Sequence, residues 1–292
     1  LNEPSVVAVA ENRLMGRKEI LAVGTEAKQM FGRTPGTISA VRPLRDGVIA
    51  DFDITSDMLK EFIRRAMTSS PLTKARVMIC IPSGVTEVER RAVHDAARSA
   101  GAKQVSLIEE PMAAAIGMGI DVESPEGCMV VDIGGGTTEI AVISLGGIVS
   151  NRSIKIGGDD LNMDIVEYMG RMHNLRIDEP TAERIKMKVG SALPELEDAP
   201  EDYMVIGPNK VTALPMQVPI SYQEIAHCMD KSISKIESAI LQALEATPPE
   251  LYADIVKSGI YLTGGGALLH GLSKRLTDKI TIPFHVAEDP LH

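Results

Sequence analysis

The stretch VVDIGGGTTEIAVI, from Val130 to Ile143, places an acid, three glycines and two threonines between two apolar runs. Glycines let backbone N–H groups approach a ligand closely, and successive N–H groups form a nest that binds anions. A P-loop or a dinucleotide-binding fold would continue as a helix, but the β-branched residues that follow these glycines favour a strand. We therefore predict a strand–loop–strand phosphate hairpin. Its expected ligand donors are Gly134, Gly135, Gly136, Thr137 and Thr138.

Asp132 stands at the end of the first strand of this predicted hairpin. It is placed to hold a water molecule of a hydrated Mg²⁺ ion, because Mg²⁺ in proteins usually keeps several of its waters. The alternative is a glycine-rich turn in which the aspartate only caps a neighbouring element. Both interpretations fit this stretch alone.

A second triple glycine, Gly264 to Gly266, follows a predicted strand and precedes a helix that should begin near Ala267. A helix N-terminus behind glycines favours a phosphate or the close approach of a flat base. Close packing without a ligand would explain the same residues. Two glycine loops, one in each half of the chain, suggest a ligand bound between the halves.

Two adjacent carboxylates, Glu109 and Glu110, follow a predicted strand and directly precede Pro111. Ligands of α/β proteins bind at the carboxyl ends of strands, where a carboxylate can orient or deprotonate a water that attacks a phosphate. An acid that caps the helix starting at Pro111 is the alternative.

Two further segments are ambiguous on their own. In AERIKMKVGSA (182–192), Glu183 and Lys186 are three residues apart and so share one face of a helix, either as a binding pair or as a surface ion pair. In IGGDD (156–160), two glycines precede two acids.

Strand and helix patterns alternate along the chain, which indicates a layered α/β fold. ARVMICIP (75–82) predicts a buried strand, and Pro111 should occupy the first position of a helix. Because the later half repeats the theme, we predict an internal duplication of one α/β unit. The capping boxes that we predict are Thr86 with Glu89 and Ser221 with Glu224.

Composition narrows the function classes. The 292 residues carry a net charge of −10 without a basic cluster, which argues against a nucleic-acid partner. No apolar run reaches the roughly 18 residues that a membrane span needs. The three cysteines, Cys80, Cys128 and Cys228, lack metal-site spacing, and we expect them to be buried, reduced thiols.

Eight stretches in order along almost the whole chain resemble the MreB family of bacterial actin homologues, which belongs to the ATPase superfamily of actin, heat-shock chaperones and sugar kinases. A kinase or a chaperone would share the glycine loops, but not RPLRDGVIADF together with EEPMAAAIG. The matching stretches are NEPSVVAV, RPLRDGVIADF, SGVTEVERRAV, LIEEPMAAAIG, VVDIGGGTTEIAVISLGGIV, AERIK, TPPEL and GIYLTGGGALLHGL.

The resemblance implies an actin-like ATPase fold, with two duplicated α/β domains and a nucleotide cleft between them. The first domain would cover 1–124 with a subdomain insertion at about 12–44, and the second 125–292 with an insertion at about 161–224. The family's first phosphate hairpin would precede Leu1 and its last helix would follow His292. We therefore expect the full protein, rather than these residues alone, to hydrolyse ATP efficiently.

The resemblance also implies a role for each candidate residue. The hairpin from Gly134 would be the second phosphate loop, Asp132 would orient the water shell of Mg²⁺, and Glu110, more than Glu109, would position the attacking water. The residues implied to contact the nucleoside are Gly158 and Asp159 near the ribose, Glu183 and Lys186 beside the nucleoside, and Gly264, Gly265, Gly266 and Ala267 around the adenosine.

The implied activity is that of a cytoskeletal ATPase. Subunits would add head-to-tail into protofilaments, and the filaments would maintain rod shape by guiding cell-wall synthesis at the inner face of the cell membrane. Many relatives bind membrane through an N-terminal amphipathic helix or an apolar loop. The loop would fall near MTSSPL (67–72), which has only three apolar residues.

Two other classes use the same kind of ATP site. A small-molecule kinase would need a substrate-binding acid and a specificity insertion, and 11–45 is too short to show one. A peptide-binding chaperone would need a substrate domain after the ATPase body.

Overall fold

A computed structural model describes residues 2–12, 17–67 and 75–291. The chain forms two compact units, one made of Leu1–Ile81 with Val85–Ile108 and the other of Pro82–Gly84 with Glu109–His292. The units thus separate after residue 108, whereas the domain boundary at 124 and the insertions at 12–44 and 161–224 stay predictions.

In the first unit, the antiparallel sheet β2-β1-β3 packs its apolar side chains against the helix α2. Val7 and Val9 alternate inward along β1 and meet Ile54 and Met58 of α2, which recur at helical spacing. The elements of this unit are β1 (Val7–Asn12), β2 (Arg17–Val23), α1 (Thr25–Met30), β3 (Ile38–Val41), β4 (Leu44–Arg45), β5 (Val48–Ile49), α2 (Phe52–Ala66), β6 (Arg76–Ile81), α3 (Glu87–Ser99) and β7 (Gln104–Glu109).

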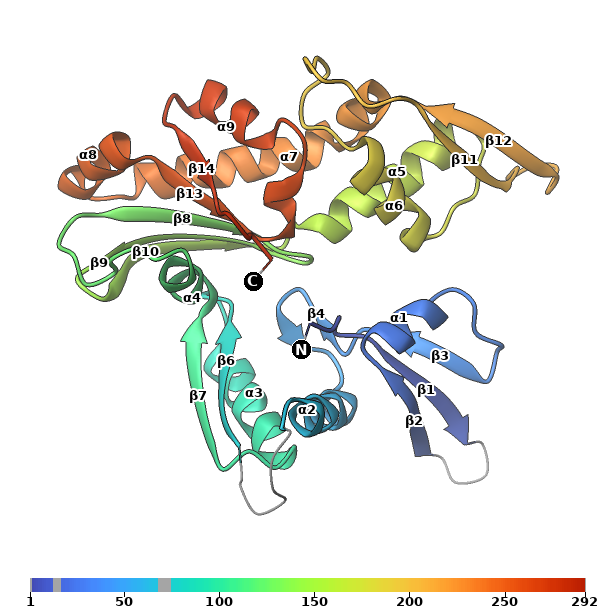
Figure 1. The fold of residues 1–292 in the computed structure, drawn as a ribbon, viewed down its shortest axis with the longest axis horizontal. Helices are drawn as coiled ribbons and strands as arrows, with labels where there is room; N and C mark the ends of the chain where they lie inside the picture. The colour runs from blue at the N-terminus through green and yellow to red at the C-terminus, as the bar shows by residue number, and fades with distance from the viewer. Residues whose placement is uncertain (1, 13–16, 68–74, 292) are drawn as a thin grey trace. The chain divides into compact units, whose positions relative to one another are not determined.

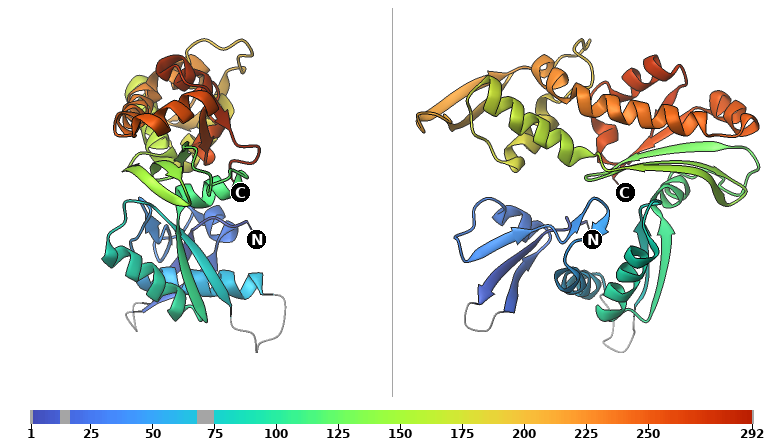
Figure 2. Two further views of the ribbon diagram at one scale, coloured as in Figure 1. Left: turned by 90° about the vertical axis from the view of Figure 1, so that its left-hand side faces the viewer. Right: turned by 180° about the vertical axis from the view of Figure 1, so that it is seen from behind.

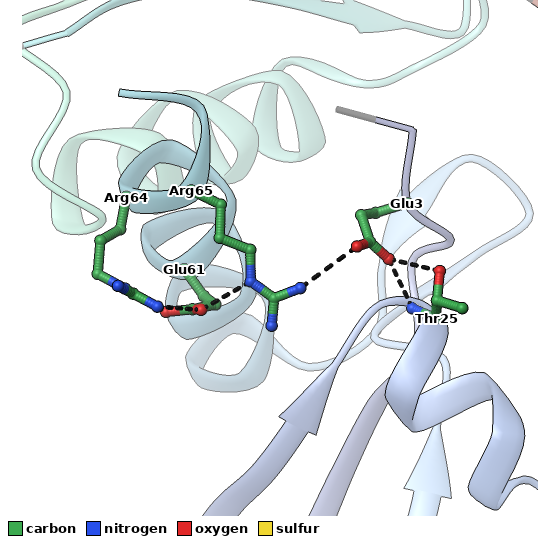
Figure 3. Close-up of polar contacts among 5 residues, drawn as sticks. All are labelled: Glu3, Thr25, Glu61, Arg64 and Arg65. Carbon is green, nitrogen blue, oxygen red and sulfur yellow. Dashed lines mark hydrogen bonds and ion pairs between the residues drawn. The ribbon is translucent and has the colours of Figure 1, made fainter. Parts of the chain in front are cut away.

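A polar network joins the start of the chain to both α1 and α2 (Figure 3). The Glu3 carboxylate accepts hydrogen bonds from the amide and hydroxyl of Thr25 at the start of α1, and it pairs with Arg65 of α2. Arg64 and Arg65 both donate to Glu61, and these bonds lower the pKa of Glu61 to about 2. Three separate segments of the first unit are held together in this way.

The strand β6 and the helix α3 confirm some expectations and correct others. Thr86 and Glu89 form the predicted capping box, and Gly101 ends the helix with a left-handed φ of 101°. However, β6 alternates between exposed and half-buried residues until its last residue, the buried Ile81, so the prediction of a strand buried throughout is wrong. Cys80 is exposed on this strand, which also corrects the expectation that all three thiols are buried.

In the second unit, five strands form one sheet in the order β10-β9-β8-β13-β14. Strands β8, β13 and β14 are parallel, while β8, β9 and β10 form an antiparallel meander. The elements of this unit are α4 (Glu110–Gly117), β8 (Cys128–Ile133), β9 (Thr138–Ser144), β10 (Gly147–Ile154), α5 (Gly158–Met172), α6 (Glu179–Val189), β11 (Tyr203–Pro208), β12 (Pro215–Ile220), α7 (Tyr222–Glu245), α8 (Pro249–Ser258), β13 (Ile260–Thr263), the 3₁₀ turn η1 (Gly265–Leu268), α9 (Leu272–Ile280) and β14 (Phe284–Val286).

Both faces of this sheet are covered (Figure 1). The helix α4 lies on one face, against a cluster that contains Val130 and Ala141, and α7, α8 and α9 lie on the other face. Because side chains alternate along a strand, the opposite residues Val131 and Ile140 point into the larger core under α7. The apolar runs of β8 and β9 follow from this burial on both faces.

Helices α5 and α6 and the hairpin β11–β12 form a smaller layer at one end of α7, as the view from behind shows (Figure 2). One face of α7 lies in the core, and its apolar residues are all buried: Ile225, Met229, Ile233, Ile236, Ile240 and Leu244. Along the middle of α7, Glu237 and Ser234 accept hydrogen bonds from the Arg275 guanidinium of α9, which also donates to the Ala192 carbonyl oxygen. Within the described residues, no helix is both long and apolar enough to cross a membrane.

The start of α7 carries the second predicted capping box, and it is confirmed. Glu224 accepts hydrogen bonds from Ser221 and from the Tyr168 hydroxyl, and His173 Nε2 lies 2.9 Å from its carboxylate. Burial alone would raise the pKa of Glu224, but these hydrogen bonds outweigh burial and leave the pKa below its usual value.

Replacing Glu224 by glutamine should lower the free energy of unfolding by about 1 kcal/mol at pH 7, because a charged cap is lost. A carboxylate whose folded pKa is lowered stabilises the protein above its unfolded pKa of about 4.3, and that stability is lost as pH falls through the folded pKa. The difference between wild type and variant should therefore shrink at pH 4. Urea unfolding at both pH values measures it, with Glu250→Gln in the first turn of α8 as a matched control. Equal midpoints for wild type and Glu224→Gln at pH 7 would contradict the assignment.

Candidate functional site

A row of polar side chains crosses the sheet of the second unit at the hairpin end. In the strand register, Asp132 of β8 lies opposite Glu139 of β9, and Glu139 lies opposite Ser153 of β10. On the other side of Asp132, the paired residue is Thr263 of β13. Since side chains directly opposite each other point to the same face, these four share the face that α4 covers.

Glu110, the first residue of α4, adds a third carboxylate to this row. Burial, and after it the charges of Asp132 and Glu139, raise its pKa to about 7. Burial and the charge of Glu139 likewise raise the pKa of Asp132 to about 6. Like charges held together out of water favour protonation, so a cation bound beside the row would favour the ionised forms of these acids.

Helix α4 starts one residue earlier than expected, at Glu110, so that Pro111 is its second residue instead of its first. Glu109 is the N-cap residue by its backbone, but its side chain makes no capping hydrogen bond. The alternative of a capping acid is thus met in position but not in hydrogen bonding, and the catalytic role of Glu110 stays a prediction.

The predicted strand–loop–strand hairpin is present, with β8 and β9 joined by Gly134 to Thr137. Its loop is closed by the Gly134 amide, which donates to the Thr137 carbonyl oxygen at 2.9 Å. Gly134 and Gly135 also accept hydrogen bonds from the amides at the start of α5, Gly158 (2.9 Å) and Asp159 (2.8 Å). The structure therefore brings IGGDD directly against the hairpin.

The two hairpin threonines, Thr137 and Thr138, differ in whether their hydroxyl groups are available to a ligand. Thr138 is fully buried, and its hydroxyl donates to the Ile156 carbonyl oxygen at 2.8 Å. A role for Thr138 as a ligand donor would require that bond to be exchanged. Thr137, which is 7% exposed, stays the better candidate of the two.

Lys186 extends from α6 to the start of α5. Its Nζ donates to the Gly158 carbonyl oxygen at 2.6 Å, so α6 is fastened to the start of α5. Glu183 lies one turn earlier on α6, beside the buried stripe of Ala182 and Ile185. The helical pair was predicted correctly, and its contact with a nucleoside stays a prediction.

The second glycine loop packs closely against the hairpin strand. A Cβ atom on Gly264 would lie 2.3 Å from Asp132 Oδ1, and one on Gly266 would lie 2.2 Å from Ile133 Cγ2. Both glycine loops belong to the second unit, so the expectation of one loop in each half is wrong. Glycine is required here for close backbone packing beside Asp132.

The helix expected near Ala267 is also corrected. Gly265–Leu268 forms a 3₁₀ turn, and the α-helix begins only at Leu272, after Gly271 in the left-handed region. The Ser191↔His270 bridge and the bond from the Ala192 amide to the His270 carbonyl oxygen hold the chain extended in between. This tertiary pairing interrupts a sequence that has a helical pattern.

Glu139 is the acid of the row that the sequence motifs did not single out. An acid in the apolar run TEIAVIS was the available signal, because a strand buried on both faces rarely carries a charge without a reason. Among the described residues, no group of three or more His, Cys, Asp or Glu side chains is arranged to coordinate a metal ion directly.

Comparisons with known proteins decide the family. The model described as MreB/Mbl protein matches residues 1–292. Over 292 residues the chain is 50% identical to the cell shape-determining protein MreB of Escherichia coli (strain K12), covering 100% of this chain and 84% of that protein. The chain belongs to the MreB/Mbl family. It is also 47% identical over 291 residues to the cell shape-determining protein Mbl of Bacillus subtilis (strain 168), covering 100% of this chain and 86% of that protein.

Solved structures of the MreB/Mbl family share this fold. MreB5 of Spiroplasma citri bound to ADP matches with a TM-score of 0.93 and 39% identity, over 100% of this chain and 86% of that one. The MamK double helical filament matches with a TM-score of 0.81 over 99% of this chain and 87% of that one, at 19% identity, and this likeness shows the fold alone. The predicted actin-like α/β fold is confirmed.

Proposed function

We propose that this chain binds ATP with Mg²⁺ at the acidic row and glycine loops of the second unit, and that it hydrolyses ATP as part of filament turnover. The observation that carries the proposal is the row itself, in which burial raises the pKa of Glu110 to about 7 and that of Asp132 to about 6. Carboxylates whose negative charges repel one another beside an anion-binding hairpin fit a hydrated dication with its phosphates. The relative MreB5 binds ADP.

The residues would divide the work as follows. Asp132 would hold a water of Mg²⁺, and the bound ion would supply charge neutralisation for the phosphates. The Gly135 and Gly136 backbone would cradle phosphate oxygens, since a Cβ on Gly135 would meet nothing nearer than Asp159 Oδ2 at 3.7 Å. Glu110 would take a proton from, or orient, the attacking water, a task for which a pKa near neutrality is suitable.

The nucleoside side of the site would be formed by the other candidates. Gly158 and Asp159 would lie near the ribose and Glu183 and Lys186 beside the nucleoside. Gly264, Gly265, Gly266 and Ala267 would pack around the adenosine.

We further propose that subunits add head-to-tail into filaments, that ATP favours the polymer, and that the filaments guide cell-wall synthesis at the inner membrane face. Membership of a family of cell shape-determining proteins supports this over the kinase and chaperone alternatives. Most of the apolar loop expected at 67–72 lies outside the described residues, so a membrane contact there stays a prediction.

Sedimentation of the full-length protein tests the proposal. With ATP and Mg²⁺, in the presence of lipid vesicles, we expect a larger pelleted fraction and filaments by electron microscopy, while samples without nucleotide stay in the supernatant. EDTA added with ATP is the control for the metal. Sedimentation that does not respond to nucleotide, together with an absence of filaments on lipid, would overturn the proposed function.

A further inference from the structure

The Glu139 carboxylate is buried, and hydrogen bonds from its surroundings stabilise it there. Its side chain is 1% exposed in a strand where every residue is buried. A carboxylate in such a place must find hydrogen-bond donors, because burying it without them costs several kcal/mol. The residues that donate hydrogen bonds to Glu139 therefore identify the segments that it holds in place.

The donors come from two separate segments. Ser83 gives Glu139 Oε2 both its backbone amide (3.1 Å) and its hydroxyl (2.6 Å), and Ser153 of β10 gives Oε1 its hydroxyl (2.5 Å). All three donors are neutral, and hydrogen bonds to a charged group are the strong ones. One carboxylate thus ties the Ser83 segment to two neighbouring strands.

The segment that contains Ser83 has a special position in the chain. The chain leaves the first unit after Ile81, contributes Pro82–Gly84 to the second unit, and returns to the first unit at Val85. Only three residues make this excursion, so few contacts can hold them. Two further contacts hold this segment: Asn151 Nδ2 donates to the Ser83 carbonyl oxygen (3.4 Å), and Gly84 approaches so closely that a Cβ there would lie 3.2 Å from Ser153 Cβ.

The other neighbour of Glu139 is the candidate site. Glu139 lies between Ser153 and Asp132 in the row, and its charge acts on both Asp132 and Glu110. Any shift of the Glu139 carboxylate would therefore affect the segment Pro82–Gly84 as well as Asp132 and Glu110.

We propose that Glu139 is a positioning residue, which fastens the crossing segment Pro82–Gly84 to the hairpin strands and thereby fixes the geometry of the acidic row. The role is carried by its hydrogen bonds to Ser83 and Ser153. This inference rests on the proposed ATPase function for its catalytic consequence, but the anchoring itself does not.

Two substitutions of Glu139 in the full-length protein separate the anchor from a general loss of structure. Glu139→Gln keeps a carbonyl oxygen for Ser83 and should lose less turnover than Glu139→Ala. Glu139→Ala removes both acceptors, and we expect kcat for ATP to fall about 10-fold with ATP affinity changed less than about 3-fold, since a misplaced site loses rate more than binding. If the alanine variant does not fold, Ser153→Ala removes one of the bonds and should give a smaller fall in kcat. Ser150→Ala, whose hydroxyl has no partner among the described residues, is the matched control on the same strand.

Hydrogen–deuterium exchange without nucleotide measures the anchor independently of ATP. The peptide that covers Pro82–Gly84 should exchange about 10-fold faster in Glu139→Ala, as expected when a charge-assisted hydrogen bond to the Ser83 amide is lost. Unchanged exchange, or a glutamine variant as slow in turnover as the alanine variant, would overturn the inference. If the wild type itself hydrolysed no ATP, the proposed function would fail while the exchange experiment still decided the anchor.

Discussion

Replacing Glu110 by glutamine should slow ATP hydrolysis by the full-length protein at least about 10²-fold while ATP binding is retained, because a positioned acid–base group contributes about that much. Glutamine keeps the size and the polarity of the side chain but cannot accept the proton of the attacking water. Glu109→Gln is the matched control, since it removes the neighbouring charge at the start of the same helix. Single-turnover phosphate release measures the hydrolysis rate of each variant, and ATP affinity is measured separately. Equal rates in wild type and Glu110→Gln would reject the assignment.

The pH dependence gives a second readout for Glu110. A general base must be ionised, and burial raises its pKa to about 7, so kcat/KM of the wild type should rise as pH increases through about 7. In Glu110→Gln this rise should flatten. The sign for stability is the opposite: an acid whose folded pKa is raised binds more protons in the folded state, so its ionisation destabilises the fold as pH rises. The variant should therefore be no less stable than wild type at pH 8.

Replacing Gly264 by alanine should lower the free energy of unfolding of the second unit by about 4 kcal/mol, from backbone strain and overpacking together. Gly264 has φ 81° and ψ 165°, a region that is almost exclusive to glycine. The new Cβ would also lie 2.3 Å from Asp132 Oδ1 and 2.4 Å from the Ile133 carbonyl oxygen. Since the carbonyl belongs to the backbone of β8, the clash cannot be relieved by a side-chain rotation.

Gly265→Ala provides the matched control for Gly264→Ala. Its Cβ would meet only Leu291 Cδ2 at 3.4 Å, an ordinary contact with a side chain near the end of the chain. We expect Gly265→Ala to unfold within about 1 kcal/mol of wild type, because no backbone strain is added. Urea unfolding of both variants in the full-length protein, without nucleotide, measures the difference. Equal destabilisation by the two substitutions would show that strain at Gly264 is not the cause.

Local chemistry explains why much of the site could be predicted from the sequence. The β-branched run after Gly136 excludes a helix, and Ser221 with Glu224 marks a helix start, because these effects act within a few residues. The carboxylates at Asp132 and Glu110 could be found because each ends a strand or starts a helix.

Long-range pairing explains what could not be predicted. The extended chain between η1 and α9 depends on a bridge from Ser191 to His270, which are far apart in sequence. Likewise, Glu139 has a recognisable oddity in the sequence, but its donors at Ser83 and Ser153 lie 56 and 14 residues away. The exposure of Cys80 follows from packing on β6, which the apolar letters of its strand do not specify.

The bonds from Gly158 and Asp159 to Gly134 and Gly135 have a mechanical consequence. They join the tip of a loop directly to the first turn of a 15-residue helix, without a flexible side chain in between. A shift of the loop would therefore move the start of α5, and the bond from Lys186 to Gly158 would couple α6 to the same shift. Because α6 packs against β11, the hairpin β11–β12 would be coupled to the loop through backbone and packing contacts.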